Sequence, residues 1–250
     1  MRVLVTGAAS GIGAAVATRL LAEGADVTGL ACEDAPASRW TRLDLADLDA
    51  IDALQLAPCD ALVNVVGLPP GPGRAARVLA SNFLGVRRLT ERVLPFLTPG
   101  GAIVSLAAKS GSLWREHLRE VRALMALERP GQLPEFIARL AVSELRAYEL
   151  SKEALIVWTK VQTSRLQSMG LRANTVSAAA VETPYLEDFT SALGPRVARN
   201  LSLTGRPGTA DEIAAAMVFL ASPESGWIKG VDLAVDGGLT TLHEIEALSL

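Results

Sequence analysis

The chain has 250 residues, of which half are apolar and a fifth are charged, and its formal net charge is −3. This length suits one well-buried α/β domain over residues 1–250 and is too short to need two domains. The small negative charge gives no reason to expect nucleic acid or an anionic membrane as a partner. No apolar run reaches the roughly eighteen residues of a membrane span, and the opening MRVLVTG is typical of a strand rather than a signal peptide. We therefore expect a soluble, cytoplasmic protein.

Thiols and imidazoles are few in this sequence. Cys32 and Cys59 are the only cysteines, and they show neither a CxxC spacing nor nearby histidines. We interpret both as small buried hydrophobic residues, because a disulfide framework or a metal site would need more of them. His117 and His243 are isolated in the sequence and are expected at the surface. No metal site is predicted.

Short β-rich runs alternate with segments of helical length along the whole chain. Most of these runs are continuously apolar, as strands covered on both faces must be. The alternation predicts a single doubly wound, Rossmann-type parallel sheet that binds its ligand at the carboxyl ends of the strands. The predicted strands lie at residues 3–5, 27–30, 61–66, 102–106, 172–178 and 233–235.

Helices are predicted between these runs from apolar stripes and end signals. Two stripes at helical spacing lie over residues 12–20 and 89–97. Thr209 and Glu212 form a capping box ahead of the apolar run IAAAMVFLA, which predicts that a helix begins there.

A glycine-rich segment, TGAASGIG at residues 6–13, follows the first predicted strand and opens an amphipathic helix. In this context Gly7 permits a tight turn, Gly11 lets the backbone approach phosphates, and Gly13 lets the helix pack on the sheet. A glycine triplet alone would be weak evidence, because any strand-turn-helix connection can use glycine. Its place between a strand and a helix favours dinucleotide binding over a purely structural turn.

Tyr148 and Lys152, in the run YELSK, lie one helical turn apart on the same helix face. A phenol with a pKa near 10 is a poor base at neutral pH. A cation about 5 Å away would stabilise the phenolate by roughly 3 kcal/mol, or about two pKa units, at an effective dielectric of 20. Any solvated helix can show this pair by chance, so its place between the fourth predicted strand and an apolar helix supports the interpretation. We predict Tyr148 as a general acid/base and Lys152 as the group that tunes it.

The glycine-rich turn and the YxxxK pair together resemble the short-chain dehydrogenase/reductase family, marked by TGxxxGxG near the N-terminus and YxxxK in mid-chain. The resemblance covers residues 3–239. It implies a nicotinamide dinucleotide cofactor and a catalytic set of Tyr148, Lys152 and Asn82. The cofactor-binding residues that it implies are Gly7, Ser10, Gly11, Ile12, Gly13, Asp44, Leu45, Asn64, Gly67, Tyr148, Lys152 and Thr183.

Several of these matches have ordinary structural alternatives. Asp44, in RLDLAD, matches the family aspartate that faces the adenine amino group, and a helix N-cap is the competing interpretation. Asn64 and Gly67, in LVNVVG, stand where the family has NNAG beside the adenosine ribose, and a buried strand that ends in glycine fits equally well. Asn82, in SNFLGV, matches an asparagine that kinks its helix and holds a water against the lysine, although a helical asparagine is usually exposed. Thr183, in VETP, matches the threonine that meets the nicotinamide carboxamide.

The position of the family's catalytic serine differs in this chain. The run IVSLAAKSG at residues 103–111 aligns with IVNISSxxG, which puts Ala108 where the serine is expected. Alanine cannot donate a hydrogen bond to the substrate oxygen, and loss of a comparable donor typically costs about 10² to 10³ in turnover. Ser105 points into the strand and Ser110 comes two residues late, so either would substitute only if the strand end is rearranged.

Three connections also depart from the common family pattern. Residues 112–145 contain two amphipathic helices broken at the Pro-Gly pair 130–131, where most of the family has a short loop. The connections 30–44 and 67–82 are compressed. Together these features resemble the bacterial hydroxysteroid dehydrogenase/carbonyl reductase subgroup. We expect the insert to lie on the subunit or substrate side, residues 184–203 to share in substrate selectivity, and a homodimer to form through the C-terminal strand region.

Cofactor preference is predicted from the end of the second strand. Ala31 occupies the position of the aspartate found in NAD-preferring relatives, so a charge-assisted hydrogen bond to the ribose is missing. No arginine stands where a 2′-phosphate would need one, and Glu33 and Asp34 would repel that phosphate. This favours NAD(H) over NADP(H). Arg39 or Arg42 would reverse the preference if the compressed loop folds back.

Three functions compete on this evidence. The first is an NAD(P)(H)-dependent oxidoreductase of an alcohol or ketone on an apolar small molecule. The second is a redox-neutral biosynthetic reaction on the same scaffold, such as a dehydration, isomerisation or cyclisation. It is motivated by Ala108 and by Ala178 and Ala179, which replace a proline-glycine pair beside the nicotinamide. The third is a nucleotide-sensing or structural relative without turnover, against which the intact Tyr148 and Lys152 argue.

Overall fold

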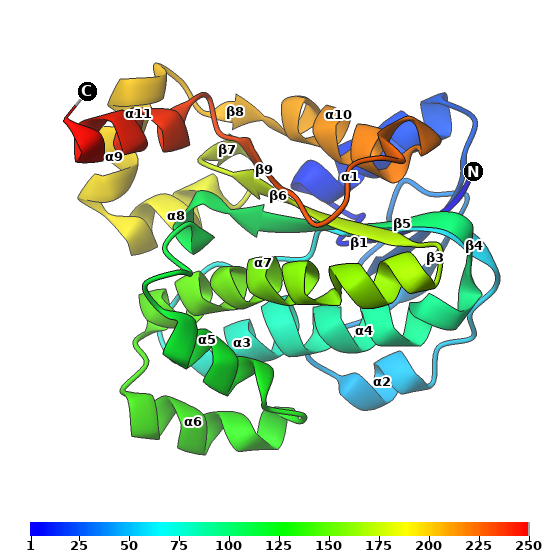
Figure 1. Cartoon of the computed structure of the whole chain (residues 1–250), viewed down its shortest axis with the longest axis horizontal. Helices are drawn as coiled ribbons and strands as arrows, with labels where there is room; N and C mark the ends of the chain where they lie inside the picture. The colour runs from blue at the N-terminus through cyan, green and yellow to red at the C-terminus, as the bar shows by residue number, and fades with distance from the viewer. Residues whose placement is uncertain (250) are drawn as a thin grey trace.

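The computed structural model describes residues 1–249, and at its centre is a parallel β-sheet with helices on both faces (Figure 1). The strands of the central sheet are β1 (Arg2–Thr6), β2 (Asp26–Ala31), β3 (Arg39–Arg42), β4 (Cys59–Asn64), β5 (Leu97–Ala108), β6 (Arg172–Ala178) and β9 (Asp232–Val235). Their order is β3-β2-β1-β4-β5-β6-β9, and every neighbouring pair is parallel. The order reverses between β1 and β4, which is the switch point where doubly wound sheets bind ligands. The predicted fold class is confirmed.

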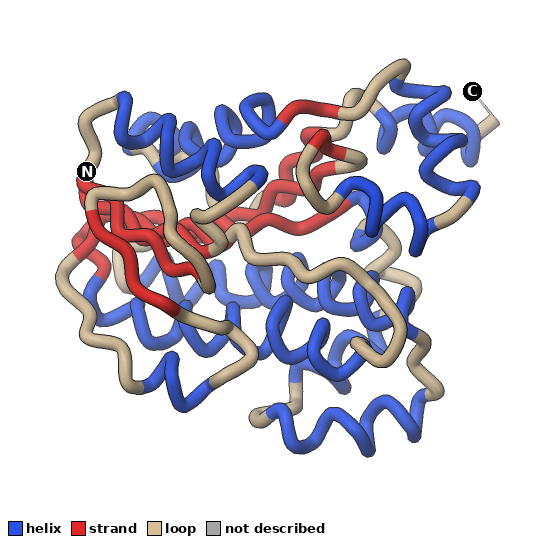
Figure 2. Tube along the Cα trace, turned by 180° about the vertical axis from the view of Figure 1, so that it is seen from behind, coloured by secondary structure: helices blue, strands red, loops and turns tan. Residues whose placement is uncertain are grey.

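The helices form a layer on each face of this sheet, as the view from behind also shows (Figure 2). They are α1 (Gly11–Ala22), α2 (Leu48–Asp52), α3 (Ala75–Leu79), α4 (Val86–Val93), α5 (Leu118–Met125), α6 (Leu133–Leu140), α7 (Glu144–Ser168), α8 (Leu186–Leu193), α9 (Pro195–Thr204), α10 (Ala210–Ala221) and α11 (Leu239–Leu248). One layer contains α1 and α10, and the other contains α3, α4 and α7 with α5 and α6 outside them (Figure 1). Helices α8, α9 and α11 gather beyond the carboxyl ends of the strands.

The capping box predicted at the start of α10 is present. The Thr209 hydroxyl accepts a hydrogen bond from the Glu212 amide at 3.2 Å, and the Glu212 carboxylate accepts one from the Thr209 amide at 2.8 Å. The helix predicted over residues 89–97 is shorter than expected. It ends at Val93, because Pro95 lies in a 3₁₀ turn and Leu97 begins β5.

The edge strand β3 was not predicted. All four of its residues, RWTR, are exposed, so the segment has no apolar run by which it could be identified. It pairs only with β2, in a register that joins Thr28 to Arg39 and Ala31 to Arg42. The compressed connection after β2 therefore holds a strand. A separate two-stranded pair, β7 (Val181–Glu182) and β8 (Gly208–Thr209), lies near the end of the sheet.

The insert before α7 forms α5 and α6, which are separated at the predicted Pro-Gly break. Val121 and Leu124 on α5, and Leu133 and Phe136 on α6, are almost completely buried in the same hydrophobic cluster as residues of α4 and α7. The insert is therefore an outer layer that shares the core of the protein.

The two cysteines differ in their surroundings. Cys59 is buried at the start of β4, as expected, and burial raises the pKa of its thiol to about 11. Cys32 is exposed, so the prediction that it is buried was wrong. The reason is its position just beyond β2, where the chain leaves the sheet. Among residues 1–249, no helix combines the length and apolar character that crossing a bilayer requires.

Candidate active site

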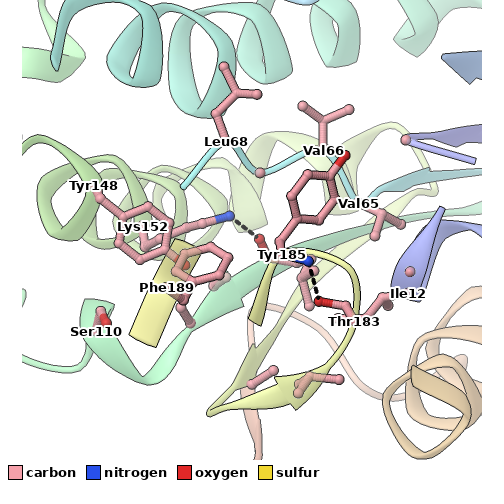
Figure 3. Close-up of a pocket in the computed structure, with 18 of the residues that line it drawn as sticks. Ile12, Val65, Val66, Leu68, Ser110, Tyr148, Lys152, Thr183, Tyr185 and Phe189 are labelled. Carbon is pink, nitrogen blue, oxygen red and sulfur yellow. Dashed lines mark hydrogen bonds between the residues drawn. The ribbon is translucent and has the colours of Figure 1, made fainter. Parts of the chain in front are cut away.

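A cavity of about 570 Å³ lies at the carboxyl ends of the strands. It extends from the turn after β1, past the ends of β4, β5 and β6, to α8 and α9 (Figure 3). This is the location that the parallel sheet predicts for a ligand.

The glycine-rich turn forms one wall of the cavity. Gly7 and Gly11 have φ angles of +68° and +50°, in the region that favours glycine. A Cβ on Gly13 would lie 2.0 Å from the carbonyl oxygen of Gly7, so no side chain fits there. Ser10 and Ile12 line the cavity, and Ser10 is the N-cap of α1, whose N-terminus is suited to an anion. These residues fit a dinucleotide pyrophosphate.

The wall beyond this turn contains Asp44 and Leu45. The Asp44 carboxylate accepts hydrogen bonds from the Ala46 amide at 2.9 Å and from Nη2 of Arg77 at 2.7 Å. Asp44 is not the helix N-cap that competed with its cofactor role, because Asp47 caps α2. Arg77 also lines the cavity. This partner lies on α3 and was not predicted from the sequence.

The segment from which the cofactor preference was predicted lies at the same end of the cavity. Ala31 and Glu33 line the cavity. Arg39 forms an ion pair with Asp26 at the opposite end of β2, so its guanidinium is held away from the cavity. Arg42 pairs in register with Ala31 at the strand end, and it is not among the described residues that line the cavity.

Tyr148 and Lys152 both lie on α7, face the cavity and are almost completely buried (Figure 3). Helix α7 begins after Ser143, whose hydroxyl accepts a hydrogen bond from the Arg146 amide at 3.2 Å. Nζ of Lys152 donates to the carbonyl oxygen of Leu106 at 2.9 Å and lies 5.8 Å from the centroid of the Tyr148 ring. The predicted pair is therefore present at the end of β5.

Burial is the main cause of the pKa shifts of both residues. It raises the pKa of the Tyr148 phenol above its ordinary value and lowers the pKa of the Lys152 ammonium to about 8. Both shifts favour the neutral form. The prediction that the neighbouring cation lowers the pKa of the phenol was wrong, because it considered the charge of Lys152 and not the desolvation of Tyr148. In the protein without a cofactor the phenol is protonated, which suits it to donate a proton.

The surroundings of the phenol are apolar. Ala108 and Val78 form a buried cluster with Tyr148, and Leu68 and Phe189 pack against that cluster. The Phe189 ring meets the Tyr148 ring edge-on, with 5.2 Å between the centroids. The alanine at the end of β5, which the sequence resemblance aligned with the family's serine, thus belongs to a hydrophobic contact.

The two candidate replacement serines lie in different places. Ser105 is buried within β5, where its hydroxyl accepts a hydrogen bond from the Asn64 amide group at 3.3 Å, and it does not line the cavity. Ser110 lies in the 3₁₀ turn Lys109–Gly111 and lines the cavity (Figure 3). Of the two, only Ser110 is placed to meet a ligand.

The two asparagines do not line the cavity themselves. Asn82 lies in a π-helical segment, Ala80–Gly85, and its amide group forms two hydrogen bonds with the backbone of Leu68, at 2.8 and 3.0 Å. Asn64 is buried and donates to Thr90 and Ser105, which joins β4 to α4 and β5. Their direct contacts therefore position the backbone around the cavity.

The end of β4 contributes backbone to the cavity instead. Val65, Val66 and Gly67 line it, directly after Asn64. A Cβ on Gly67 would lie 3.1 Å from Nζ of Lys152, so this glycine lets the lysine approach the strand end.

The segment after β6 closes the opposite side. Ala178, Ala179 and Thr183 line the cavity. A Cβ on Gly11 would lie 3.3 Å from the Cβ of Thr183, so the threonine lies directly against the glycine-rich turn. Among the described lining residues, the end of β6 and the two positions after it contribute only alanines.

Side chains on the far side of Tyr148 come from segments whose sequence does not identify a substrate. The region 184–203 contributes α8 and α9, as expected, whereas the insert contributes only its first residues, Ser112 and Leu113. Phe189 was missed because nothing in the sequence distinguishes it from an ordinary amphipathic-helix residue. The apolar residues on this side are Leu68, Leu113, Leu186, Phe189, Leu193 and Val197.

Comparison with known proteins gives consistent matches along the chain. Residues 134–240 match the family described as "Enoyl-(Acyl carrier protein) reductase", and residues 3–110 match the "NAD dependent epimerase/dehydratase family". A coniferyl-alcohol dehydrogenase of Pseudomonas sp. is 34% identical over 97% of both chains. A 3-alpha-hydroxysteroid dehydrogenase/carbonyl reductase of Comamonas testosteroni is 27% identical over 95% of both chains.

A solved structure has the same architecture. The 3-alpha-hydroxysteroid dehydrogenase of Pseudomonas sp. B-0831, crystallised with NADH, superposes with a TM-score of 0.83. It is 28% identical, and the match covers 97% of this chain and 98% of that one. The match therefore extends over nearly the whole length of both chains.

Proposed function

The chain belongs to the short-chain dehydrogenase/reductase family of oxidoreductases, and on that premise we propose that it interconverts an alcohol and a ketone on an apolar small molecule, with NAD(H) as the cofactor. The observation that carries this proposal is the buried pair of Tyr148 and Lys152, which faces the same cavity as the glycine-rich turn. The relatives named for coniferyl alcohol and for 3-alpha-hydroxysteroids support an alcohol or ketone as the reacting group.

A bound nicotinamide would supply or accept the hydride. Tyr148 would donate its phenolic proton to the carbonyl oxygen during reduction and take it back during oxidation. Lys152 would tune the acidity of the phenol through its charge, and it would contact the cofactor ribose, as the family resemblance implies. Asn82 acts on this site through Leu68, whose backbone it fixes beside the phenol.

The alanine at position 108 affects the expected turnover, because it cannot donate a hydrogen bond to the substrate. With no hydroxyl at that position, Tyr148 is the principal donor to the substrate oxygen. Ser110 is the nearest serine along the chain that lines the cavity. A serine at residue 108 would add a second donor, of a kind that contributes up to about 10² to 10³ in turnover where it reaches the substrate oxygen.

Two observations favour NAD(H) over NADP(H). Glu33 lies on the cavity wall, where its carboxylate would repel a 2′-phosphate, and Arg39 is held away from the cavity by Asp26. We also propose that residues 1–250 act as one domain, since the insert shares the core of the sheet layers. The cytoplasmic location expected from the sequence stays a prediction.

We propose a homodimer that uses the edge strand β9. This strand pairs only with β6 among the described residues, and Trp227, just before it, is 94% exposed. An unpaired strand edge and a large exposed apolar side chain are both suited to burial against a second copy. Light scattering that returned a tetramer or a strict monomer would contradict this assembly.

Incubation of the protein with NAD⁺ or NADH tests the proposed function. A panel of secondary alcohols and ketones, with coniferyl alcohol and 3α-hydroxysteroids among them, should include a compound that changes the nicotinamide absorbance. The control is the variant Tyr148→Phe, which keeps the ring and removes the proton donor.

A redox-neutral reaction is the second candidate, and the apolar cluster of Ala108, Val78 and Tyr148 favours it. A dehydration or isomerisation needs an acid/base such as the phenol and does not need a polarising serine. Chromatographic analysis of the same incubations would identify it as a product formed with no change in nicotinamide absorbance.

A further inference from the structure

Positive side chains line the part of the cavity that lies beyond Tyr148. Lys109 comes from the turn after β5, and Arg196 and Arg199 come from α9. The carboxylates that line the cavity, Glu33 and Asp44, both lie at the other end, beside the glycine-rich turn. The substrate end therefore presents cations and no carboxylate of its own among the described lining residues.

Two of these cations already have carboxylate partners outside the cavity lining. Arg199 forms two hydrogen bonds with Glu246, at 2.7 and 3.0 Å. Arg196 donates from Nη1 to Glu149 at 2.8 Å, and its other guanidinium nitrogens make no hydrogen bond within the described part of the chain. Arg196 thus keeps donors free for a ligand.

Lys109 differs from both arginines because no carboxylate lies within ion-pair distance of it in residues 1–249. Its Nζ donates to the Ser112 hydroxyl at 3.0 Å. Desolvation is the main effect on this ammonium and lowers its pKa. Asp236 and Glu244 oppose this shift, and Arg196 adds a smaller effect in the same direction as desolvation. A partly buried ammonium with only a hydroxyl as partner is suited to bind an anion.

Lys109 and Tyr148 line the same cavity. Lys109 directly follows Ala108, which shares a buried cluster with Tyr148, and consecutive Cα atoms are about 3.8 Å apart. Ser112 and Leu113 continue the same wall. Because both residues line one cavity, a small molecule whose oxygen meets the phenol can extend along this wall toward Lys109.

We propose that the substrate carries an anionic oxygen group, a carboxylate or a phosphate, which Lys109 binds with Arg196 as a second donor. The apolar body of the substrate lies between this group and the reacting carbon, against Leu113 and Phe189. This inference rests on the proposed oxidoreductase function, since it describes the substrate of the same site.

Equilibrium binding tests the inference without requiring turnover. The protein saturated with NAD⁺, which cannot reduce a ketone, is titrated in a calorimeter with 4-acetylbenzoate, with its neutral analogue 4-acetylbenzamide, and with 4-acetylphenyl phosphate. We expect each anion to bind about 10- to 100-fold more tightly than the amide, the range of a charge-assisted hydrogen bond. The stronger of the two anions identifies the group as carboxylate or phosphate.

Variants show which residue is responsible. Lys109→Met should remove the preference for the anions and leave the amide unchanged, whereas Lys109→Arg should keep it. Arg196→Gln should reduce the preference as well, and it tests the claim independently if the Lys109 variant does not fold. Lys229→Met is the matched control, because Lys229 is an exposed lysine beside Trp227 that does not line the cavity.

Equal binding of anions and amide, no binding of any of the three, or an equal loss for all three in Lys109→Met would overturn the inference. An equal loss would instead indicate that Lys109 polarises the ketone. Oxidation of NADH by the same ketones is measured separately. Anion-selective binding without NADH oxidation would leave this inference standing and contradict the proposed oxidoreductase function.

Discussion

The ring of Phe189 stands edge-on to the ring of Tyr148, with 5.2 Å between the centroids and 60° between the planes. Phe189 comes from α8, beyond the sheet, and Tyr148 comes from α7, beneath it. This contact, together with Ala108 and Val78, encloses the phenol in apolar surroundings and accounts for the raised pKa of Tyr148.

Replacement of Phe189 should therefore affect the chemistry more than the fold. Phe189→Ala removes an aromatic contact worth about 0.5 to 1.5 kcal/mol and opens the phenol to water. We expect kcat/KM to fall about tenfold, while the melting temperature changes by only a few degrees because Phe189 is partly exposed. Phe189→Leu, which keeps the site apolar, should retain most of the activity. A variant with unchanged kinetics would show that the contact does not matter for turnover.

Ala108 gives the sharpest separation between the two candidate functions. If the protein is a dehydrogenase, Tyr148→Phe should remove nearly all turnover, and Ala108→Ser should leave turnover unchanged or raise it. If the reaction is redox-neutral, the added hydroxyl lies unpaired in an apolar cluster and costs about 1 to 3 kcal/mol. Ala108→Ser would then slow the native reaction. Steady-state rates of the two variants, with product analysis, distinguish these outcomes.

Gly13→Val should abolish dinucleotide binding. The new Cβ would lie 2.0 Å from the Gly7 carbonyl oxygen, so α1 cannot keep its position against the turn. Calorimetry with NADH measures the loss. Gly131→Val is the matched control, because no atom lies within 4 Å of a Cβ built there. Unmodified protein that bound neither NADH nor NADPH would refute the assignment of this turn.

NADH should bind more tightly than NADPH, because Glu33 on the cavity wall opposes a 2′-phosphate. Glu33→Gln should narrow the difference between the two dissociation constants. Arg39→Ala should have no effect on it, since Arg39 is engaged by Asp26. Equal or tighter binding of NADPH would direct attention to Arg42, beside Ala31.

Lys152 should make stability depend on pH. Its pKa is about 8 in the folded protein against an ordinary value of 10.5, so below pH 8 the folded state holds a buried ammonium at a penalty of about 3 kcal/mol. The unfolded chain binds more protons between these two values, and stability therefore rises with pH in that window.

Denaturant unfolding of the native protein and of Lys152→Met measures this effect. The variant should be the more stable protein at pH 7, and its advantage should shrink by about 2 kcal/mol at pH 9.5. Measurements stop below pH 10, because the raised pKa of Tyr148 makes stability fall at higher pH. An advantage that does not vary with pH would mean that Lys152 is not buried as a charge.

Local features of this protein could be predicted from the sequence because neighbouring residues determine them. The turn at Gly7 and Gly11 depends on backbone φ angles, the Tyr148 and Lys152 pair on helical periodicity, and the Thr209 capping box on a spacing of three residues. The buried strands were identified by their continuous apolar runs, and β3 was missed because an exposed edge strand needs none.

The tertiary structure alone decided which distant residues meet. His117 appeared isolated, yet its Nδ1 lies 2.7 Å from a carboxylate oxygen of Glu153, which is otherwise buried against Arg146. The sequence around Lys109 does not show that this lysine shares a cavity with Arg196 and Arg199 of α9. Such contacts join segments far apart in the chain, and their geometry follows from the order of the strands and the packing of the helices. No local pattern encodes that arrangement, because the residues next to each partner in the sequence are compatible with many other tertiary arrangements.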